Sequence, residues 1–163
     1  MWSIKLNKDR FKFSSSHFTI FDKETAEALH GHNYYVTLEV SKSASLKNGL
    51  LIDVVILKKE LSKILEPLDE KILIPKNSKY LNLDYEGENL NLEFANKRYS
   101  FPLEDVIVLD VENVTMEELC KLFSDQLKEF LVDYNYTVTV QETKGQSASY
   151  SYTPDLKDLR PDR

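Results

Sequence analysis

Residues 29–40 read LHGHNYYVTLEV, and the character of the side chains alternates along this stretch. One set of alternate positions carries His32, Tyr34, Val36, Leu38 and Val40. Because successive side chains of a strand point to opposite faces of its sheet, the pattern predicts a strand from about position 30 to 40 with one buried face. Residues two apart share a face, so His30 and His32 are expected to project side by side.

The N-terminal segment predicts a further strand pairing with this one. Apolar residues alternate over positions 2–6, and after a polar step at 7–10 the alternation resumes on the other parity, from Phe11 to His17. A bulge or a tight turn would account for the change of phase. A short antiparallel return between the two strands would bring His17 alongside His30 and His32.

Two helices are indicated by their caps. Asp53 is a suitable N-cap for a helix over 54–65, which Pro67 would stop. Thr115, with a glutamate three residues later, has the spacing of a capping box ahead of a helix to about Leu131.

The remaining strands are short. They are predicted at 81–85, 90–94, 98–101, 134–140 and 147–152, the last two joined by a turn at Lys144 and Gly145. This order predicts an α+β fold in which two helices cover one face of an antiparallel sheet. The chain is expected to be a single domain over 1–163, with a small β insert at about 74–109 and a loose tail at about 153–163.

Composition narrows the class of protein. The chain has 163 residues and a formal net charge of −6, which argues against a nucleic-acid-binding surface. It has one cysteine, Cys120, so no internal disulfide is possible and a cytoplasmic location is expected. No unbroken apolar run opens the sequence, so neither a signal peptide nor a membrane span is predicted.

The three histidines of the chain, His17, His30 and His32, form the strongest functional signal. Three converging imidazoles would hold a metal ion and leave a fourth position for water or substrate. Structural zinc sites instead use four ligands, usually including cysteines, so the pattern favours catalysis or ligand capture. Zinc fits best, although imidazoles also bind iron and nickel. The alternative is a set of ordinary strand histidines that bind no metal.

Several motifs resemble those of the 6-pyruvoyl-tetrahydropterin synthase family. They are FSSSHF at 13–18, LHGHNY at 29–34, GLLID at 49–53, PLD at 67–69, EN at 112–113 and VQET at 140–143. The resemblance implies the tunnelling fold (T-fold), in which sheets of several subunits join into a barrel, commonly a homohexamer. It also implies zinc (Zn2+) on the three histidines and a reduced pterin as substrate.

The chain departs from the family pattern at two catalytic positions. The family's cysteine ahead of His-Gly-His is missing from 24–29, and Glu70 follows Asp69 where a histidine is usual. Cys120 lies in the second predicted helix and is expected to be a core residue. Glu27 resembles the subgroup with glutamate in place of the cysteine, whose product is 6-hydroxymethyl-7,8-dihydropterin, made from 7,8-dihydroneopterin triphosphate.

The resemblance assigns further roles to acidic residues. Glu27 is the candidate for the catalytic base, a role that a carboxylate serves well if desolvation raises its pKa; the alternative is a solvated loop residue like Glu24. Asp69 and Glu70 would act as an acid–base pair, the alternative being a solvated turn. Glu142 would anchor the pterin through its amino and ring N–H groups, the alternative being an exposed charge at a strand end.

The sequence therefore predicts a zinc-dependent lyase of folate-like pterin biosynthesis. One rival is a 6-carboxy- or 6-pyruvoyl-tetrahydropterin synthase, and another is a non-catalytic oligomer that binds zinc and pterin. Asp53 is interpreted as a helix cap, and Glu112 as a weaker contact to substrate. The basic residues considered for the triphosphate are Lys63, Lys71, Lys76 and Lys79.

Overall fold

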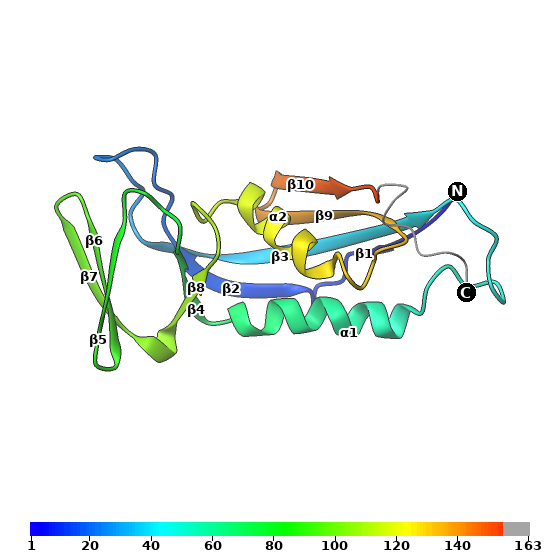
Figure 1. Ribbon diagram of the computed structural model, residues 1–163, viewed down its shortest axis with the longest axis horizontal. Helices are drawn as coiled ribbons and strands as arrows, with labels where there is room; N and C mark the ends of the chain where they lie inside the picture. Colours follow the sequence, from blue (N-terminus) through cyan, green and yellow to red (C-terminus); the bar gives the residue numbers. More distant parts are fainter. Residues whose placement is uncertain (155–163) are drawn as a thin grey trace.

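The computed structural model describes residues 1–154, which form a long main sheet with a smaller sheet at one end (Figure 1). The main sheet has seven strands: β1 (Trp2–Leu6), β2 (Lys12–His17), β3 (His30–Lys42), β4 (Lys71–Pro75), β8 (Val106–Leu109), β9 (Asn135–Thr143) and β10 (Gln146–Tyr152). Their order is β10-β9-β3-β2-β4-β8, and β1 also pairs with β3. The long strand predicted from the opening pattern is thus central to the sheet.

The main sheet is mixed rather than wholly antiparallel as predicted. β2 pairs with β4, and β4 with β8, in parallel, whereas the other pairs are antiparallel. Neither β4 nor β8 was predicted as a strand. The two strands read KILIP and VIVL, apolar runs without alternation, which are typical of strands covered on both faces.

β1 and β2 pair with successive parts of β3 and lie one after the other along the same side of it. The change of phase at positions 7–10 is therefore a local irregularity between these two strands. Leu6 pairs with Leu38, while Phe13 pairs with Tyr34, so the N-terminal segment has extra residues between these pairs. A turn closed by the bond from Phe11 N to Lys8 O, 2.9 Å, takes them up. Leu6 and Phe13 consequently both face the core, as the alternation predicted.

Helices α1 (Val54–Leu65) and α2 (Met116–Leu127) cover one face of the main sheet (Figure 1). Asp53 caps α1, since its Oδ1 accepts the Val55 N–H at 2.8 Å, and Thr115 Oγ1 accepts the Glu118 N–H at 3.3 Å at the start of α2. α2 ends four residues earlier than predicted, because the Lys128 N–H bonds to Asp125 O and tightens the chain into turns. Two short 3-10 helices, Glu66–Leu68 and Leu103–Asp105, follow α1 and β7.

The main core lies between the sheet and the two helices. Leu38 of β3, Leu57 and Leu61 of α1 and Phe123 of α2 are all buried there. Phe13 stacks on Tyr34 with a distance of 4.9 Å between ring centroids, and this pair marks the end of the core nearest to the histidines.

The small sheet consists of β5 (Asn82–Glu86), β6 (Asn89–Phe94) and β7 (Lys97–Pro102). It confirms the predicted meander, with Gly87 in the left-handed region at φ 59° in the first turn. Its apolar face forms a second core with Phe18, Ile20 and Ile74. The strands β4 and β8 flank this meander but belong to the main sheet, so only the residues between them leave that sheet.

Two further expectations concern a loose C-terminal tail and the lack of a membrane span. Thr153 and Pro154 have no regular secondary structure, and the rest of the predicted tail, 155–163, lies outside the described residues. Within 1–154, each helix falls short of the length and apolar character that a membrane span requires.

Candidate functional site

The three histidines converge where β2 ends and β3 begins, next to the small sheet (Figure 1). His17 pairs directly with His30 across the two strands. One ligand atom from each imidazole lies within 4.8 Å of the others, and the ring centroids are 4.7 to 5.4 Å apart. The convergence predicted from the spacing is confirmed.

Gly31 allows the two strands to approach at this point. A Cβ built at position 31 would lie 3.3 Å from Ser16 Oγ and 3.4 Å from Ser15 O. A side chain at position 31 would therefore require Ser16 and the adjoining backbone of β2 to give way by a few tenths of an ångström, beside the pair formed by His17 and His30.

Hydrogen bonds orient two of the rings. His17 Nδ1 lies 2.9 Å from Val114 O, just ahead of α2, and His30 Nδ1 lies 2.7 Å from Ala28 O. A carbonyl only accepts, so each Nδ1 carries the proton and each Nε2 keeps a free lone pair. Burial lowers the pKa of His17, and His30 and His32 lower it further, against the opposing effects of Val114 and Glu142. His17 is therefore a neutral imidazole, the form that binds metal.

His17 Nε2 is buried and makes no hydrogen bond with the described residues. Glu142 Oε1 lies 2.9 Å away, but outside the geometry of a hydrogen bond. A buried polar atom without a partner is costly, whereas a metal ion at this point would satisfy it. The three nitrogens thus fit a metal ion in donor type and in orientation.

Glu142 lies at the end of β9, far from the histidines in sequence, but its side chain lies at the edge of the histidine cluster. Its Oε1 accepts a hydrogen bond from the Tyr34 hydroxyl at 3.0 Å and lies 3.4 Å from His32 Nε2. Burial and the neighbouring charge of Glu142 raise the pKa of Tyr34, so its hydroxyl remains a donor. The predicted substrate anchor therefore lies beside the histidines.

Glu27 lies on the loop between β2 and β3, and this loop packs against the small sheet. The Thr19 N–H donates to Glu27 Oε2 at 3.0 Å, and Lys97 of β7 donates to Glu27 O at 3.4 Å. Burial alone would raise the pKa of Glu27, but the Thr19 hydrogen bonds first, and then the electrostatic effect of the His30 and His17 side chains, outweigh it, so the pKa is lowered. The condition that desolvation raises its pKa is therefore not met, and the group is a carboxylate at neutral pH.

Asp69 and Glu70 follow the first 3-10 helix and attach to β2. Asp69 Oδ1 accepts the Ser14 N–H at 2.7 Å, and the Glu70 N–H donates to Ser14 O at 2.7 Å. Ser14 precedes His17 by three residues, roughly 10 Å along a strand. Glu70, at φ 59°, lines an open cavity of about 470 Å³ that His32 also lines. Of the two carboxylates, Glu70 is thus the one that shares a cavity with the cluster.

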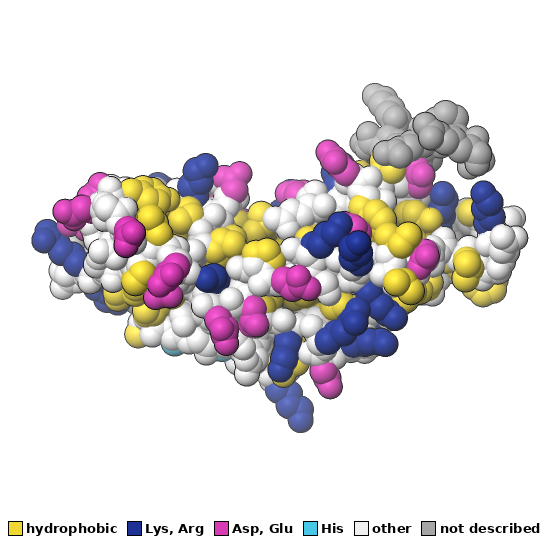
Figure 2. Space-filling view, turned by 90° about the horizontal axis from the view of Figure 1, so that it is seen from below, with side chains coloured by type: hydrophobic (Ala, Val, Ile, Leu, Met, Phe, Trp, Pro, Cys, Tyr) yellow, Lys and Arg dark blue, Asp and Glu magenta, His cyan; other side chains and the backbone are white. Residues whose placement is uncertain are grey.

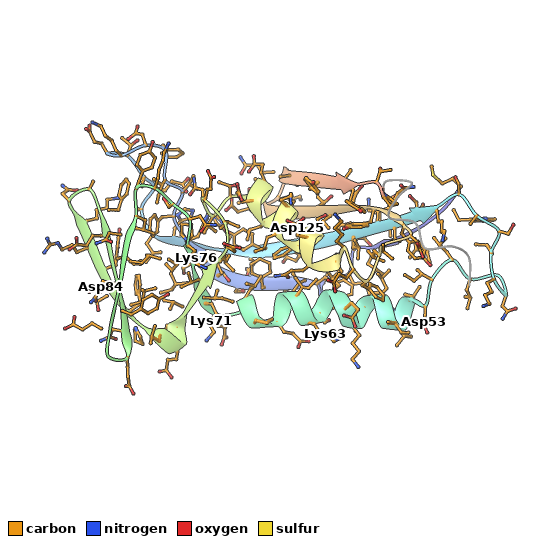
Figure 3. All side chains as sticks on the ribbon, viewed as in Figure 1. Asp53, Lys63, Lys71, Lys76, Asp84 and Asp125 are labelled. Carbon is orange, nitrogen blue, oxygen red and sulfur yellow. The ribbon has the colours of Figure 1, made fainter. Side chains whose placement is uncertain are left out.

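Three of the basic residues considered for the triphosphate, Lys63, Lys71 and Lys76, lie in different places (Figure 3). Lys63 extends from α1 and pairs with Glu60 at 2.6 Å, while Lys71 donates to Glu104 O. Lys79 lies over the Tyr80 ring and lines a cavity of about 200 Å³ with Glu112. Seen from the side of α1, Lys and Arg side chains gather over that helix (Figure 2). The structure does not single out one of them as a phosphate ligand.

Three residues of the site region were missed as such by reasoning from the sequence: Tyr34, Thr19 and Asn113. The Asn113 side chain bonds to both main-chain groups of Ile20, at 2.8 and 3.1 Å, and so ties the Glu27 loop to the segment that orients His17. An asparagine that bonds to a distant backbone leaves no periodic signal in the sequence. Cys120 is buried on α2, donates to Ala148 O at 3.2 Å and is a core residue, as predicted.

Comparison with known proteins identifies the family to which a chain with this site belongs. The family model for 6-pyruvoyl tetrahydropterin synthase matches residues 6–153. The chain belongs to this family. Its fold is the family's T-fold: the 6-pyruvoyl tetrahydropterin synthase of Plasmodium vivax has a TM-score of 0.87 and 30% identity, over 93% of this chain and 97% of that one. As a member of the family, the chain is a lyase of pterin biosynthesis.

Two further relatives bear on the chemistry of the family. A Methanocaldococcus jannaschii protein, provisionally named 6-carboxy-5,6,7,8-tetrahydropterin synthase, is 31% identical over 90% of this chain and 93% of its own length. A form of the Plasmodium vivax synthase in which a glutamate, its catalytic residue, is replaced by alanine has a TM-score of 0.86 and 29% identity, over 93% of this chain and 97% of that one.

Proposed function

We propose that the protein is a zinc-dependent lyase that converts 7,8-dihydroneopterin triphosphate into 6-hydroxymethyl-7,8-dihydropterin, for folate-like pterin biosynthesis. The observation that carries the proposal is the position of Glu27. Its carboxylate accepts the Thr19 N–H, and Thr19 and Glu27 lie two residues after His17 and three before His30, the two histidines that pair across β2 and β3. A carboxylate base therefore stands beside the cluster in a family whose synthases use cysteine ahead of His-Gly-His.

Two findings support glutamate as the base. The only cysteine of the chain, Cys120, is buried on α2 with its pKa raised to about 11, first by burial, so it is a poor nucleophile and a poor base. In addition, the Plasmodium vivax synthase has a glutamate as catalytic residue. The exchange of cysteine for glutamate is thus compatible with this fold.

The metal would be held by Nε2 of His17, His30 and His32. When bound there, zinc polarises substrate hydroxyls and lowers their pKa. We choose zinc because neutral imidazoles in a site with an open position are typical of catalytic zinc. The orphaned Nε2 of His17 and the fixed Nδ1 bonds of His17 and His30 support this assignment.

Glu27 would take the proton from the second side-chain hydroxyl of the substrate. The bond between the first and second side-chain carbons then breaks. Its electron pair stays with the first carbon and the conjugated pterin ring, and the second carbon becomes an aldehyde that leaves with the triphosphate. The first carbon must then be protonated, and we propose the pair Asp69 and Glu70 for this step. Glu70 would act directly from the cavity that it shares with His32, and Asp69 would hold the turn.

Glu142 would bind the pterin ring. A carboxylate can accept two parallel hydrogen bonds from the amino and ring N–H groups of a pterin. Its side chain is 18% exposed, so it is largely shielded from water while remaining reachable by a ligand. Its position next to His17 and His32 would place the substrate side chain toward the histidines.

We also propose that the chain assembles as a homohexamer. β10 and β8 end the main sheet, β1 pairs only with β3, and the helices cover only one face of the sheet. Open sheet edges can pair with the edges of other subunits. Sedimentation equilibrium should therefore give six times the 19.0 kDa of one chain; a well-folded monomer at micromolar concentration would contradict the assembly.

The test of the activity is a product analysis. Zinc-loaded protein is incubated with 7,8-dihydroneopterin triphosphate, and the products are identified by mass spectrometry. We expect 6-hydroxymethyl-7,8-dihydropterin together with a two-carbon aldehyde triphosphate. A pyruvoyl product, or no turnover by protein with a full complement of metal, would overturn the proposal, and the latter would favour a binding protein.

A second candidate is a 6-carboxy-tetrahydropterin synthase, favoured by the name of the Methanocaldococcus jannaschii relative. The same incubation distinguishes it, because that reaction leaves a carboxylate on the pterin ring. The mass of the pterin product therefore decides between the two candidates.

A further inference from the structure

Within residues 1–154, the hydroxyl of Tyr34 donates a hydrogen bond to Oε1 of Glu142, at 3.0 Å. Tyr34 is completely buried on the helix-covered face of β3, and no predicted role had been given to it. When a buried hydroxyl donates to a partly exposed carboxylate, the hydrogen bond satisfies the buried donor and also fixes the orientation of the carboxylate.

Tyr34 is also rigid. Its ring stacks on Phe13 at 4.9 Å and lies edge-on to His17 and His32, at 5.8 Å from each ring centroid. A side chain held on three sides cannot follow a moving partner. The position of the Tyr34 hydroxyl is therefore fixed, and its hydrogen bond determines the orientation of the Glu142 carboxylate.

Three groups approach the same oxygen of Glu142: the Tyr34 hydroxyl, His17 Nε2 and His32 Nε2. The two nitrogens cannot both bind a metal ion and donate to a carboxylate. With the histidines committed to metal, the Tyr34 hydroxyl is the group of these three that still holds Oε1. Each carboxylate oxygen can accept two hydrogen bonds, so Oε1 and the other oxygen of Glu142 both remain available to a ligand.

We propose that Tyr34 is a positioning residue for pterin recognition, which acts through Glu142 by fixing the rotamer of its carboxylate. This inference rests on the proposed role of Glu142 as pterin anchor. Its chemical consequence is a preference for flat heterocycles with two adjacent N–H donors, because only a carboxylate held still can accept two parallel bonds at once.

The test compares Tyr34→Phe with Tyr136→Phe. Both changes remove a single buried hydroxyl, since the Tyr136 hydroxyl donates to Ser124 O at 2.8 Å in the main core, away from the histidines. The probe is neopterin, an oxidised pterin whose fluorescence reports binding without turnover. Zinc content and the melting temperature are measured for each variant, together with kcat and KM for 7,8-dihydroneopterin triphosphate.

We expect Tyr34→Phe to raise the Kd for neopterin and the KM by about tenfold, since a hydrogen bond to a charged group is lost. Zinc content should stay at the wild-type value, and kcat should fall less than KM rises. Tyr136→Phe should leave the neopterin Kd within about twofold of wild type. In a Glu142→Ala background, Tyr34→Phe should have no further effect on the Kd.

An unchanged neopterin Kd in folded Tyr34→Phe would overturn the inference, and so would an equal loss in the Glu142→Ala background. If wild-type protein with its metal does not bind neopterin, it is the proposed function that fails. Should Tyr34→Phe not fold, 3-fluorotyrosine at position 34 keeps the ring and changes only the donor. This replacement at position 34 must then change the Kd for neopterin more than the same replacement at position 136.

Discussion

Glu27 and Thr19 bind each other through both main chain and side chain. The Glu27 N–H donates to Thr19 O at 2.9 Å, and the Thr19 N–H donates to Glu27 Oε2 at 3.0 Å. These two bonds fix the position of the Glu27 carboxylate on the loop between β2 and β3. Thr19 lies two residues after His17, and Glu27 lies three residues before His30, so the two bonds hold the group that we propose as the base close to both histidines in the chain.

Glu27→Gln should abolish most turnover while leaving the metal in place. The amide keeps the size of the side chain and can still accept from the Thr19 N–H, but it cannot take a proton. We expect kcat to fall by about 10² to 10⁴ with an unchanged zinc content. The matched control is Glu24→Gln, an exposed loop glutamate, which should behave like wild type. Full activity of Glu27→Gln would remove Glu27 from the mechanism.

The pH profile of the reaction tests the ionisation of the same group. Glu27 has a pKa below its ordinary value, because the Thr19 hydrogen bonds, with the electrostatic effect of the His30 and His17 side chains, outweigh burial. A depressed carboxyl is ionised throughout the neutral range and loses its charge only as the pH falls through its lowered pKa. Glu27 should therefore contribute no limb to the kcat/KM profile in the neutral range, and Glu27→Asp should leave the shape of the profile there unchanged; a limb in that range that moves with this substitution would contradict the pKa direction.

His17→Ala should remove the metal from the protein. Three nitrogens define the site, and the loss of one leaves too few ligands to hold an ion in competition with water. Metal analysis after dialysis is expected to give about one zinc per chain for wild type and close to none for the variant. Ser124→Ala, another buried polar position, serves as the control and should retain its metal. Retention of zinc by His17→Ala would show that the ion binds elsewhere.

Asn113→Ala should weaken both folding and turnover. Without the amide, the N–H and carbonyl groups of Ile20 lose their partner, and the loop that carries Glu27 is no longer tied to the start of α2. The expected cost is about 1 to 3 kcal/mol in the free energy of unfolding by urea. Asn77→Ala removes an exposed amide that pairs with Asp110 at 2.8 Å, and it should cost much less. Equal effects of the two variants would exclude a special role for Asn113.

Cys120 should be unreactive in the folded protein at pH 8. Burial first, and the charge of Glu117 in addition, raise the pKa of its thiol to about 11. A thiol reagent should therefore label Cys120 only after unfolding. Because the thiol of the unfolded chain ionises at lower pH, the contribution of Cys120 to stability is complete below about pH 8.5 and is lost as the pH rises toward 11. Rapid labelling of folded protein at pH 8 would contradict this burial.

The sequence by itself determined the features that depend on a short repeat or on a few neighbouring residues, such as the faces of strands and the starts of helices. The two-residue repeat of strands placed His30 and His32 on one face, and the caps at Asp53 and Thr115 marked where both helices begin. These features depend on a few consecutive residues, so they can be predicted without knowledge of the rest of the chain.

Only the tertiary structure decided what depends on distant segments. β4 and β8 enter the sheet in parallel, Asp69 binds the main chain of Ser14, and Glu142 meets Tyr34 across 108 positions of sequence. The direction of the pKa shift of Glu27 also belongs here, because burial and hydrogen bonding oppose each other and only their geometry decides the balance. Long-range pairing has no local period, and so it becomes visible only when the chain is folded.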